Sequence, residues 1–180
     1  AFQPAVSVSA IGSAGTWALA VGDLDGDGDL DLVLGDDGGT NQSFLNDGDG
    51  DPFDSGGNPV TDVAHYTTSL ALGDVDRDGD LDLVAGNSLT ANRLYLNDGT
   101  GNPFDPATGS DITTDAFNTW GILLADMDGD GDLDVVAGNY GEINRLYRND
   151  GTGTTWTGSN ITGDVGNTWP IAAADMDGDG

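Results

Sequence analysis

Five carboxylates fall within nine residues in the stretch GDLDGDGDLD, which runs from Gly22 to Asp31. Two related stretches repeat the pattern, GDVDRDGDLD from Gly73 and ADMDGDGDLD from Ala125. Two unit charges about 4 Å apart repel each other by about 4 kcal/mol near a protein surface. The chain offers only four arginines and no lysine to neutralise these loops. Binding of a cation is therefore the chemistry that this spacing predicts.

Calcium suits these loops because it takes roughly six to eight oxygen ligands in flexible geometry. Side chains at positions 1, 3 and 5 of each loop, a backbone carbonyl at position 7 and a carboxylate at position 9 would form the site. Glycine at position 6 permits the sharp turn. We expect three complete Ca²⁺ sites and a truncated fourth. The candidate metal-binding residues are Asp23, Asp25, Asp27, Asp29, Asp31, Asp74, Asp76, Asp78, Asp80, Asp82, Asp126, Asp128, Asp130, Asp132, Asp134, Asp175, Asp177 and Asp179.

Other interpretations of the loops fit less well. An EF-hand needs a glutamate at position 12 and flanking helices, whereas position 12 is Leu34, Ala85 or Ala137 and strands are expected on both sides. Magnesium prefers to keep several waters, and soft metals lack ligands because the chain has no cysteine and one histidine. Solvated Asp/Gly turns without a metal are the remaining alternative. Repetition of all five acids and the glycine in three loops favours calcium.

Apolar residues in front of each loop alternate with a period of two. Trp17, Leu19 and Val21 alternate with small residues, which predicts a strand with large side chains on one face and mostly small ones on the other. We expect a second strand after the loop, a third that ends in an Asn-Asp-Gly turn, and a more polar fourth that begins at an aromatic residue. The second and third strands are expected at Leu30–Leu34 and Asn41–Leu45, at Leu81–Ala85 and Asn92–Leu96, and at Leu133–Ala137 and Asn144–Arg148.

The whole unit repeats along the chain. The first aspartates of the loops, Asp23, Asp74, Asp126 and Asp175, are separated by 51, 52 and 49 residues. Four strands in a unit of about 50 residues are typical of a β-propeller blade. We therefore expect an all-β chain in which residues 1–180 form part of a single propeller. Its repeat units are 2–52, 53–103, 104–155 and a truncated 156–180, which begin at Phe2, Phe53, Phe104 and Trp156.

Composition excludes several classes of partner. The chain has 32 acidic residues against 4 basic ones and a net charge of −28, so it lacks the basic side chains that bind nucleic acid or an anionic membrane. Its apolar runs are too short for membrane insertion. The chain starts without methionine and stops inside an acidic loop, from which we expect a fragment. The open edges of a partial propeller would leave strands unpaired, and a homodimer through these edges is one way to cover them.

The loops and the DGDGDLDLV and NRLYLNDGTG segments resemble the FG-GAP repeats of integrin α-subunits, and more closely the bacterial FG-GAP-like (VCBS) repeats. The resemblance covers essentially the whole chain. It implies a seven- or eight-bladed propeller with calcium loops at one end of the blades and any ligand site at the other. It also implies a secreted or cell-surface module for adhesion or carbohydrate binding, and some propellers of this kind are polysaccharide lyases.

Three tryptophans occupy one register, six residues before the loop: Trp17, Trp120 and Trp169, with Thr68 in the second unit. They are expected to cluster at the end away from calcium, either as packing between blades or as a ligand site for sugar stacking. Catalytic residues are not predicted, because the chain has no cysteine, no lysine and one glutamate, and nothing assembles around His65.

These observations predict an extracellular calcium-binding repeat module, in which calcium is structural and the partner is an extracellular protein or a glycan. The alternative is the propeller part of a secreted polysaccharide-degrading enzyme.

Overall fold

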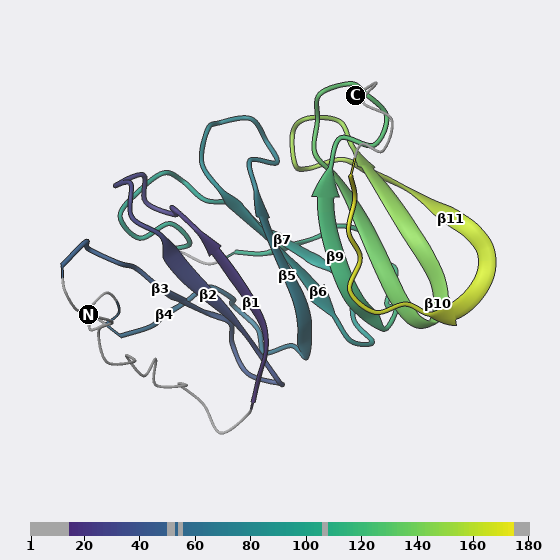
Figure 1. Cartoon of the computed structure of the whole chain (residues 1–180), viewed down its shortest axis with the longest axis horizontal. Coiled ribbons are helices and arrows are strands. Elements are labelled where there is room, and N and C mark those ends of the chain that lie inside the picture. Colours follow the sequence, from purple (N-terminus) through teal and green to yellow (C-terminus); the bar gives the residue numbers. More distant parts are fainter. Residues whose placement is uncertain (1–14, 50–52, 54–55, 106–107, 175–180) are drawn as a thin grey trace.

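The computed structural model describes residues 15–49, 53, 56–105 and 108–174. Within these ranges the chain forms antiparallel strands and no helix, and therefore no helix that could span a membrane (Figure 1). The strands make three sheets that follow one another along the chain. The first sheet holds β1 (Thr16–Gly22), β2 (Asp31–Asp36), β3 (Gln42–Phe44) and β4 (Asn58–Pro59). The second holds β5 (Thr67–Gly73), β6 (Asp82–Asn87), β7 (Arg93–Tyr95) and β8 (Ser110–Asp111), and the third holds β9 (Thr119–Ala125), β10 (Asp134–Asn149) and β11 (Trp156–Asn167).

The first three strands of each unit are confirmed at the predicted positions. In the first two sheets they form separate strands whose ends differ from the expected ones by a few residues. In the third unit, the second and third strands are joined in the single strand β10, which pairs with β9 through its first half and with β11 through its second. Gly141, with φ 74°, lies between the two halves, where an L side chain would be strained.

The expected start of the fourth strand is wrong in two units. Phe53 and Phe104 lie in turns, and the strands β4 and β8 begin only at Asn58 and Ser110. The prolines around both phenylalanines lack a backbone N–H and disfavour a ladder there. Phe104 is instead buried in the core beside the second sheet. No proline stands beside Trp156, the first residue of the truncated fourth unit, and β11 of the third sheet begins there as expected. Phe2 lies outside the described residues.

Neighbouring sheets pack face to face, with glycines on one sheet receiving leucines of the next. A Cβ atom on Gly22 of the first sheet would lie only 2.7 Å from Leu81 Cδ1. A Cβ on Gly73 of the second sheet would likewise lie 2.8 Å from Leu133 Cδ1 and 2.9 Å from Leu124 Cδ1. The large and small faces predicted from the alternation are therefore used for stacking, since each leucine fills the space that a missing side chain leaves.

The same contact occurs once more after the third sheet. A Cβ on Gly138 would lie 2.8 Å from Thr168 Cγ2 and 3.1 Å from Ile171 Cγ2. Thr168 occupies the same repeat position as Thr67. Thr67 makes the equivalent contact between the first two sheets, since its Cγ2 atom would lie 2.9 Å from a Cβ on Gly35. The start of the fourth unit thus packs on the third sheet as the second sheet packs on the first.

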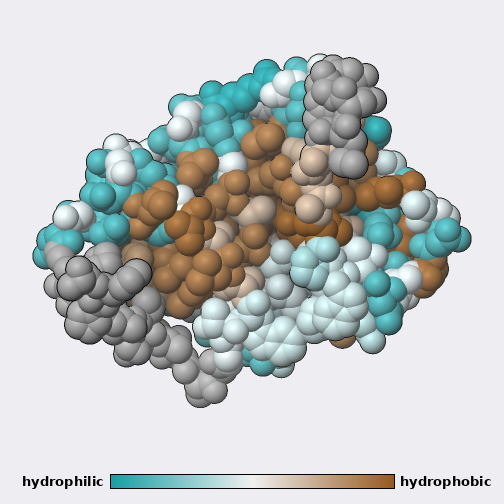
Figure 2. Space-filling view, viewed as in Figure 1, coloured by the Kyte–Doolittle hydropathy of each residue, from teal (hydrophilic) through white to brown (hydrophobic). Residues whose placement is uncertain are grey.

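The large-residue face of the first sheet is uncovered among the described residues. Leu19, Val21 and Leu30 are 59%, 52% and 60% exposed, whereas their counterparts in the next sheet, Leu70, Leu72 and Leu81, are half-buried against the first. Figure 2 shows apolar side chains gathered over the middle of the molecule, where β1, β5 and β9 run in Figure 1.

Stacking of the sheets gives a direct test. Gly86→Ala is expected to lower the free energy of unfolding by about 1–3 kcal/mol, because overpacking a filled interface has costs of this size. The new Cβ would meet Ile122 Cγ1 at 2.6 Å and Thr119 Cγ2 at 3.1 Å. Gly101→Ala is the matched control, since nothing lies within 4 Å of its Cβ position. Urea denaturation in excess calcium measures both, and equal stability of the two variants would contradict the stacking.

Candidate metal centre

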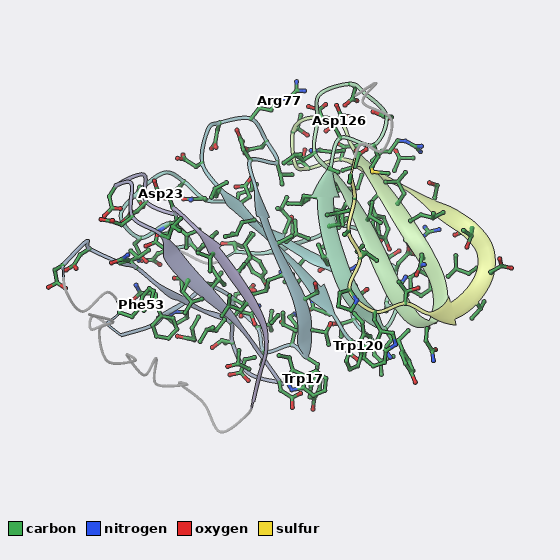
Figure 3. All side chains as sticks on the ribbon, in the orientation of Figure 1. Trp17, Asp23, Phe53, Arg77, Trp120 and Asp126 are labelled. Atoms are coloured by element: carbon green, nitrogen blue, oxygen red, sulfur yellow. The ribbon has the colours of Figure 1, made fainter. Side chains whose placement is uncertain are left out.

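Each Asp-rich loop joins the first strand of a sheet to the second. The loops follow β1, β5 and β9 and lie at one end of the molecule, where Figure 3 labels Asp23, Arg77 and Asp126. The tryptophans Trp17 and Trp120 lie at the opposite end of the same strands. The loops are thus held side by side by the stacking of the sheets.

The first aspartate of a loop gives the loop its turn. Asp126 accepts hydrogen bonds from the backbone N–H groups of Gly129, at 2.8 Å, and Gly131, at 2.9 Å. Asp23 accepts the equivalent bonds in the first loop. Gly131 has a φ of 90°, which explains why glycine occupies position 6. Hydrogen bonds from backbone amides, chiefly that of Gly129, lower the pKa of Asp126, so this carboxylate is ionised near neutral pH.

The aspartates at positions 1, 3 and 5 converge in every complete loop. Each contributes a carboxylate oxygen, and in each loop these three oxygens lie within 4.8 Å of one another. In the second loop, Asp74 Oδ1 and Asp76 Oδ1 are buried without a hydrogen-bond partner. Such clusters of hard, partly unpaired oxygens fit a calcium ion. The converging residues are Asp23, Asp25 and Asp27, Asp74, Asp76 and Asp78, and Asp126, Asp128 and Asp130.

The aspartate at position 9 has a structural task that its sequence position did not reveal. Asp82 is fully buried, and its two oxygens accept the N–H groups of Val75, at 2.8 Å, and Asn97, at 2.9 Å. Asp31 and Asp134 make the same pair of bonds in their own sheets. Each carboxylate therefore ties the loop to the end of the third strand. Their role as metal ligands stays a prediction.

The aspartates at position 7 turn their side chains toward the Asn-Asp-Gly turn of their own unit. The carboxylates of Asp29 and Asp80 occupy the space beside Gly48 and Gly99, where a Cβ would collide with them. This leaves their backbone carbonyls for the predicted role. Asp175, Asp177 and Asp179 of the truncated loop lie outside the described residues.

The third loop differs from the others because arginines reach it. Arg77, at position 4 of the second loop, pairs with Asp132 at 2.5 Å and donates to the carbonyl of Asp130. Arg148 pairs with Asp128 at 3.2 Å. Part of the charge of this loop is thus balanced by the chain itself, which the count of arginines alone did not predict.

Asparagines connect neighbouring loops. The side chain of Asn97 is buried and donates to Leu24 O of the first loop at 2.8 Å and to Leu81 O of its own loop at 3.2 Å. Asn149 links the third loop to Val75 O of the second in the same way. The Asn-Asp-Gly segments were expected to be turns, and only their repetition hinted at a further role.

The three tryptophans come together as expected, at the end away from the Asp loops. The centroid of the Trp120 ring lies 5.4 Å from that of Trp17 and 5.2 Å from that of Trp169. Tyr140, which sequence reasoning missed, joins them at 6.0 Å from Trp120. Trp17 and Trp169 are 51% and 55% exposed, so the cluster is partly open to solvent. A ligand-binding role for these tryptophans stays a prediction.

Replacement of the linking asparagine tests the connection between loops. Asn97→Ala is expected to destabilise the fold by about 1–3 kcal/mol, because two buried carbonyls lose their donor. Asn46→Ala is the matched control: its Oδ1 accepts from Gly48 N–H as that of Asn97 accepts from Gly99, but its amide nitrogen donates to Leu30 O of its own loop, at 3.3 Å, and, among the described residues, to no carbonyl of another loop. Chemical denaturation with calcium present measures the difference. An equal loss in both variants would contradict a link between loops.

The pH dependence of the calcium-free protein follows from the buried aspartates. Burial raises the pKa of Asp82 from 3.8 to about 6, and it also raises the pKa of Asp31 and Asp134. A carboxyl group whose pKa is higher in the folded than in the unfolded state stabilises the fold fully at a pH below its unfolded-state pKa. This stabilisation is lost as the pH rises through its folded-state pKa. Chelator-stripped protein is therefore expected to melt at a higher temperature at pH 5 than at pH 7. Asp82→Asn should reduce this difference, and a lower melting temperature at pH 5 would contradict the prediction.

Comparison with known proteins places these features in a family. The family model described as FG-GAP-like repeat matches residues 23–85, 74–137 and 126–180. Cartilage acidic protein 1 of Xenopus tropicalis is 31% identical over 143 residues, which cover 74% of this chain and 22% of that protein. Cartilage acidic protein 1 of Mus musculus is 30% identical over 87 residues, 47% of this chain and 14% of that protein. The chain thus spans less than a quarter of either relative. The three matched segments begin at the first aspartates of the three Asp loops, and the chain belongs to the FG-GAP-like repeat family.

Proposed function

We propose that the chain is a calcium-stabilised repeat module of an extracellular protein and serves adhesion or the recognition of a protein or glycan. The observation that carries the proposal is the convergence of three aspartate oxygens within 4.8 Å in each of three successive loops. The aspartates at positions 1, 3 and 5 would hold the ion. When bound, calcium would supply the positive charge that offsets their mutual repulsion.

A structural role for the ion is supported by what surrounds the clusters. The loops are tied to strand ends by Asp82 and its counterparts, and to each other by Asn97 and Arg77. An ion in such a loop would hold two strands and the neighbouring loop together. We propose a binding role for the module rather than a catalytic one.

The relatives support an extracellular location, since both are named for cartilage. Adhesion and recognition are also the roles for which a stack of repeats is suited, because it presents loops from several sheets at one end.

We further propose that the stack of sheets continues into a propeller. Two features support this arrangement. The start of the fourth unit already packs on Gly138 of the third sheet, and Leu19 and Val21 of the first sheet lack, among the described residues, the cover that their counterparts have. A further repeat sheet would provide that cover, from the same protein or from a second copy of the chain.

Calcium titration tests the proposed function. Calorimetry of chelator-stripped protein is expected to show binding of three ions per chain, one for each cluster. Each ion should stabilise the fold by about 2.7 kcal/mol at a hundredfold excess over its dissociation constant. Melting temperatures recorded in the same calcium series should rise accordingly.

Variants locate the ions. Asp76→Asn should reduce the number of bound ions by one, because Asp76 belongs to the cluster of the second loop. Asp164→Asn is the control, as Asp164 is exposed on β11 and lies outside every cluster. Folded protein that binds no calcium would overturn the proposal, and the loops would then be solvated turns.

A further inference from the structure

Two of the chain's four arginines pair with aspartates of the third Asp loop. Arg77 pairs with Asp132 at 2.5 Å, and Arg148 pairs with Asp128 at 3.2 Å. Among the described residues, the remaining three ion pairs involve aspartates outside the loops. Figure 3 labels Arg77 and Asp126 at the end of the molecule where the loops lie. The third loop is therefore the one whose negative charge the chain itself partly balances.

The two arginines contact different parts of this loop. Arg77 reaches the side chain of Asp132 and the backbone carbonyl of Asp130, and neither group is one of the three converging carboxylates. Arg148 instead pairs with the carboxylate of Asp128, which is a member of the converging cluster. The side chains of Arg148 and Asp128 are 42% and 35% exposed, so the pair has room to rearrange. Arg148 is thus the arginine that lies against a candidate calcium ligand.

The second loop shows the same place without an arginine. The repeat position of Arg148 is occupied by Leu96 in the second unit, and Asp76 is the counterpart of Asp128. A Cβ on Gly153 would meet both Leu96 Cδ2, at 3.4 Å, and Asp76 Cβ, at 3.5 Å, so these two side chains lie beside each other. The Oδ1 atom of Asp76 is buried without a hydrogen-bond partner. The carboxylate at position 3 is therefore free for an ion in the second loop, whereas it is paired in the third.

We propose that Arg148 sets the calcium affinity of the third loop. Without calcium, Arg148 acts as the counter-ion of the cluster. With calcium, Asp128 has to share its carboxylate between the ion and the guanidinium, and these two carry charge of the same sign. The third loop therefore binds calcium more weakly than the first two and fills last. This inference rests on the calcium role proposed above and assigns an order to the sites.

The place of the third loop in the stack would also weaken its site, so the experiment has to separate the two causes. The aspartates at positions 1 and 3 are half-buried in the first two clusters and exposed in the third. Asn97 donates to a carbonyl of the first loop and Asn149 to one of the second, and among the described residues no asparagine does so for the third. A test in the second loop, which has neighbours on both sides, removes this difference.

Calorimetric calcium titration of chelator-stripped protein measures the order. Two ions are expected to bind tightly and a third at least about tenfold more weakly, a difference of about 1.4 kcal/mol. Asp128→Asn should remove the weak ion alone. Arg148→Leu, which introduces the residue of the other units, should tighten the weak site at least about tenfold. Arg148→Lys keeps the charge and should leave the site weak, and Arg145→Gln is the control, since it removes the same charge from a pair with Asp115 outside the loops.

Two further measurements separate the effect of Arg148 from a general effect on the fold. Leu96→Arg places an arginine beside Asp76 and should weaken one of the two tight sites at least about tenfold. Arg148→Leu should melt slightly below the unchanged protein in chelator, because the cluster loses its counter-ion, and above it in excess calcium. A residue with a purely structural role would shift both melting temperatures in the same direction.

The outcomes distinguish this proposal from the calcium proposal itself. Three ions bound with equal affinity would overturn the order of filling and leave the calcium sites in place. An unchanged weak site in Arg148→Leu, or an unchanged second site in Leu96→Arg, would overturn the role of the arginine in the same way. Folded protein that binds no calcium at all would instead overturn the calcium proposal and this inference with it.

Discussion

The structure depends on the hydrogen bonds of a buried carboxylate that begins the second strand of each sheet. Asp31, Asp82 and Asp134 are the first residues of β2, β6 and β10, and each is exposed by 1% or less. Each accepts one N–H from the loop before it and one from the end of the third strand. Removal of such an acceptor would leave two buried donors unpaired, a cost of about 1–3 kcal/mol for each. The position of the loop, and therefore of the converging aspartates, follows from this contact.

Small departures from the repeat give the three units different chemistry on a common frame. Arg77 replaces the glycine of the other loops, adopts a φ of 64° and reaches the third loop. Thr68 replaces a tryptophan and leaves space between two others. In both cases the frame is unchanged, because the residues that fix it, the buried aspartates and the stacked glycines, are kept. Both of these replacements lie at the ends of the strands.

Much of the fold could be predicted from the repeat, because strand positions depend on local alternation and turns. The first three strands of each unit and the convergence of positions 1, 3 and 5 depend on neighbours within about ten residues of one another along the chain. Contacts that join different sheets could not be predicted in this way. Asn97 reaches a carbonyl 73 residues away, and Arg77 reaches one 53 residues away. The late start of β4 and β8 was missed for another reason. An aromatic residue at this position can lie in an edge strand or in the core, and the prolines around Phe53 and Phe104 disfavour the strand.

The division of each sheet into a leucine face and a glycine face gives the stack a direction. Sheets can add only head to tail, because two leucine faces would collide and two glycine faces would leave voids. A two-fold symmetric pair built on like faces is therefore disfavoured, and any copies that did associate would have to use unlike faces, an arrangement that gives either closed rings or open filaments. Duplication of one unit extends the stack without any new kind of surface. Every added sheet brings one face that packs on the sheet before it and the opposite face on which the next sheet can pack. Gene growth by whole repeats is thus compatible with the packing at every step, whereas insertion of half a unit is not.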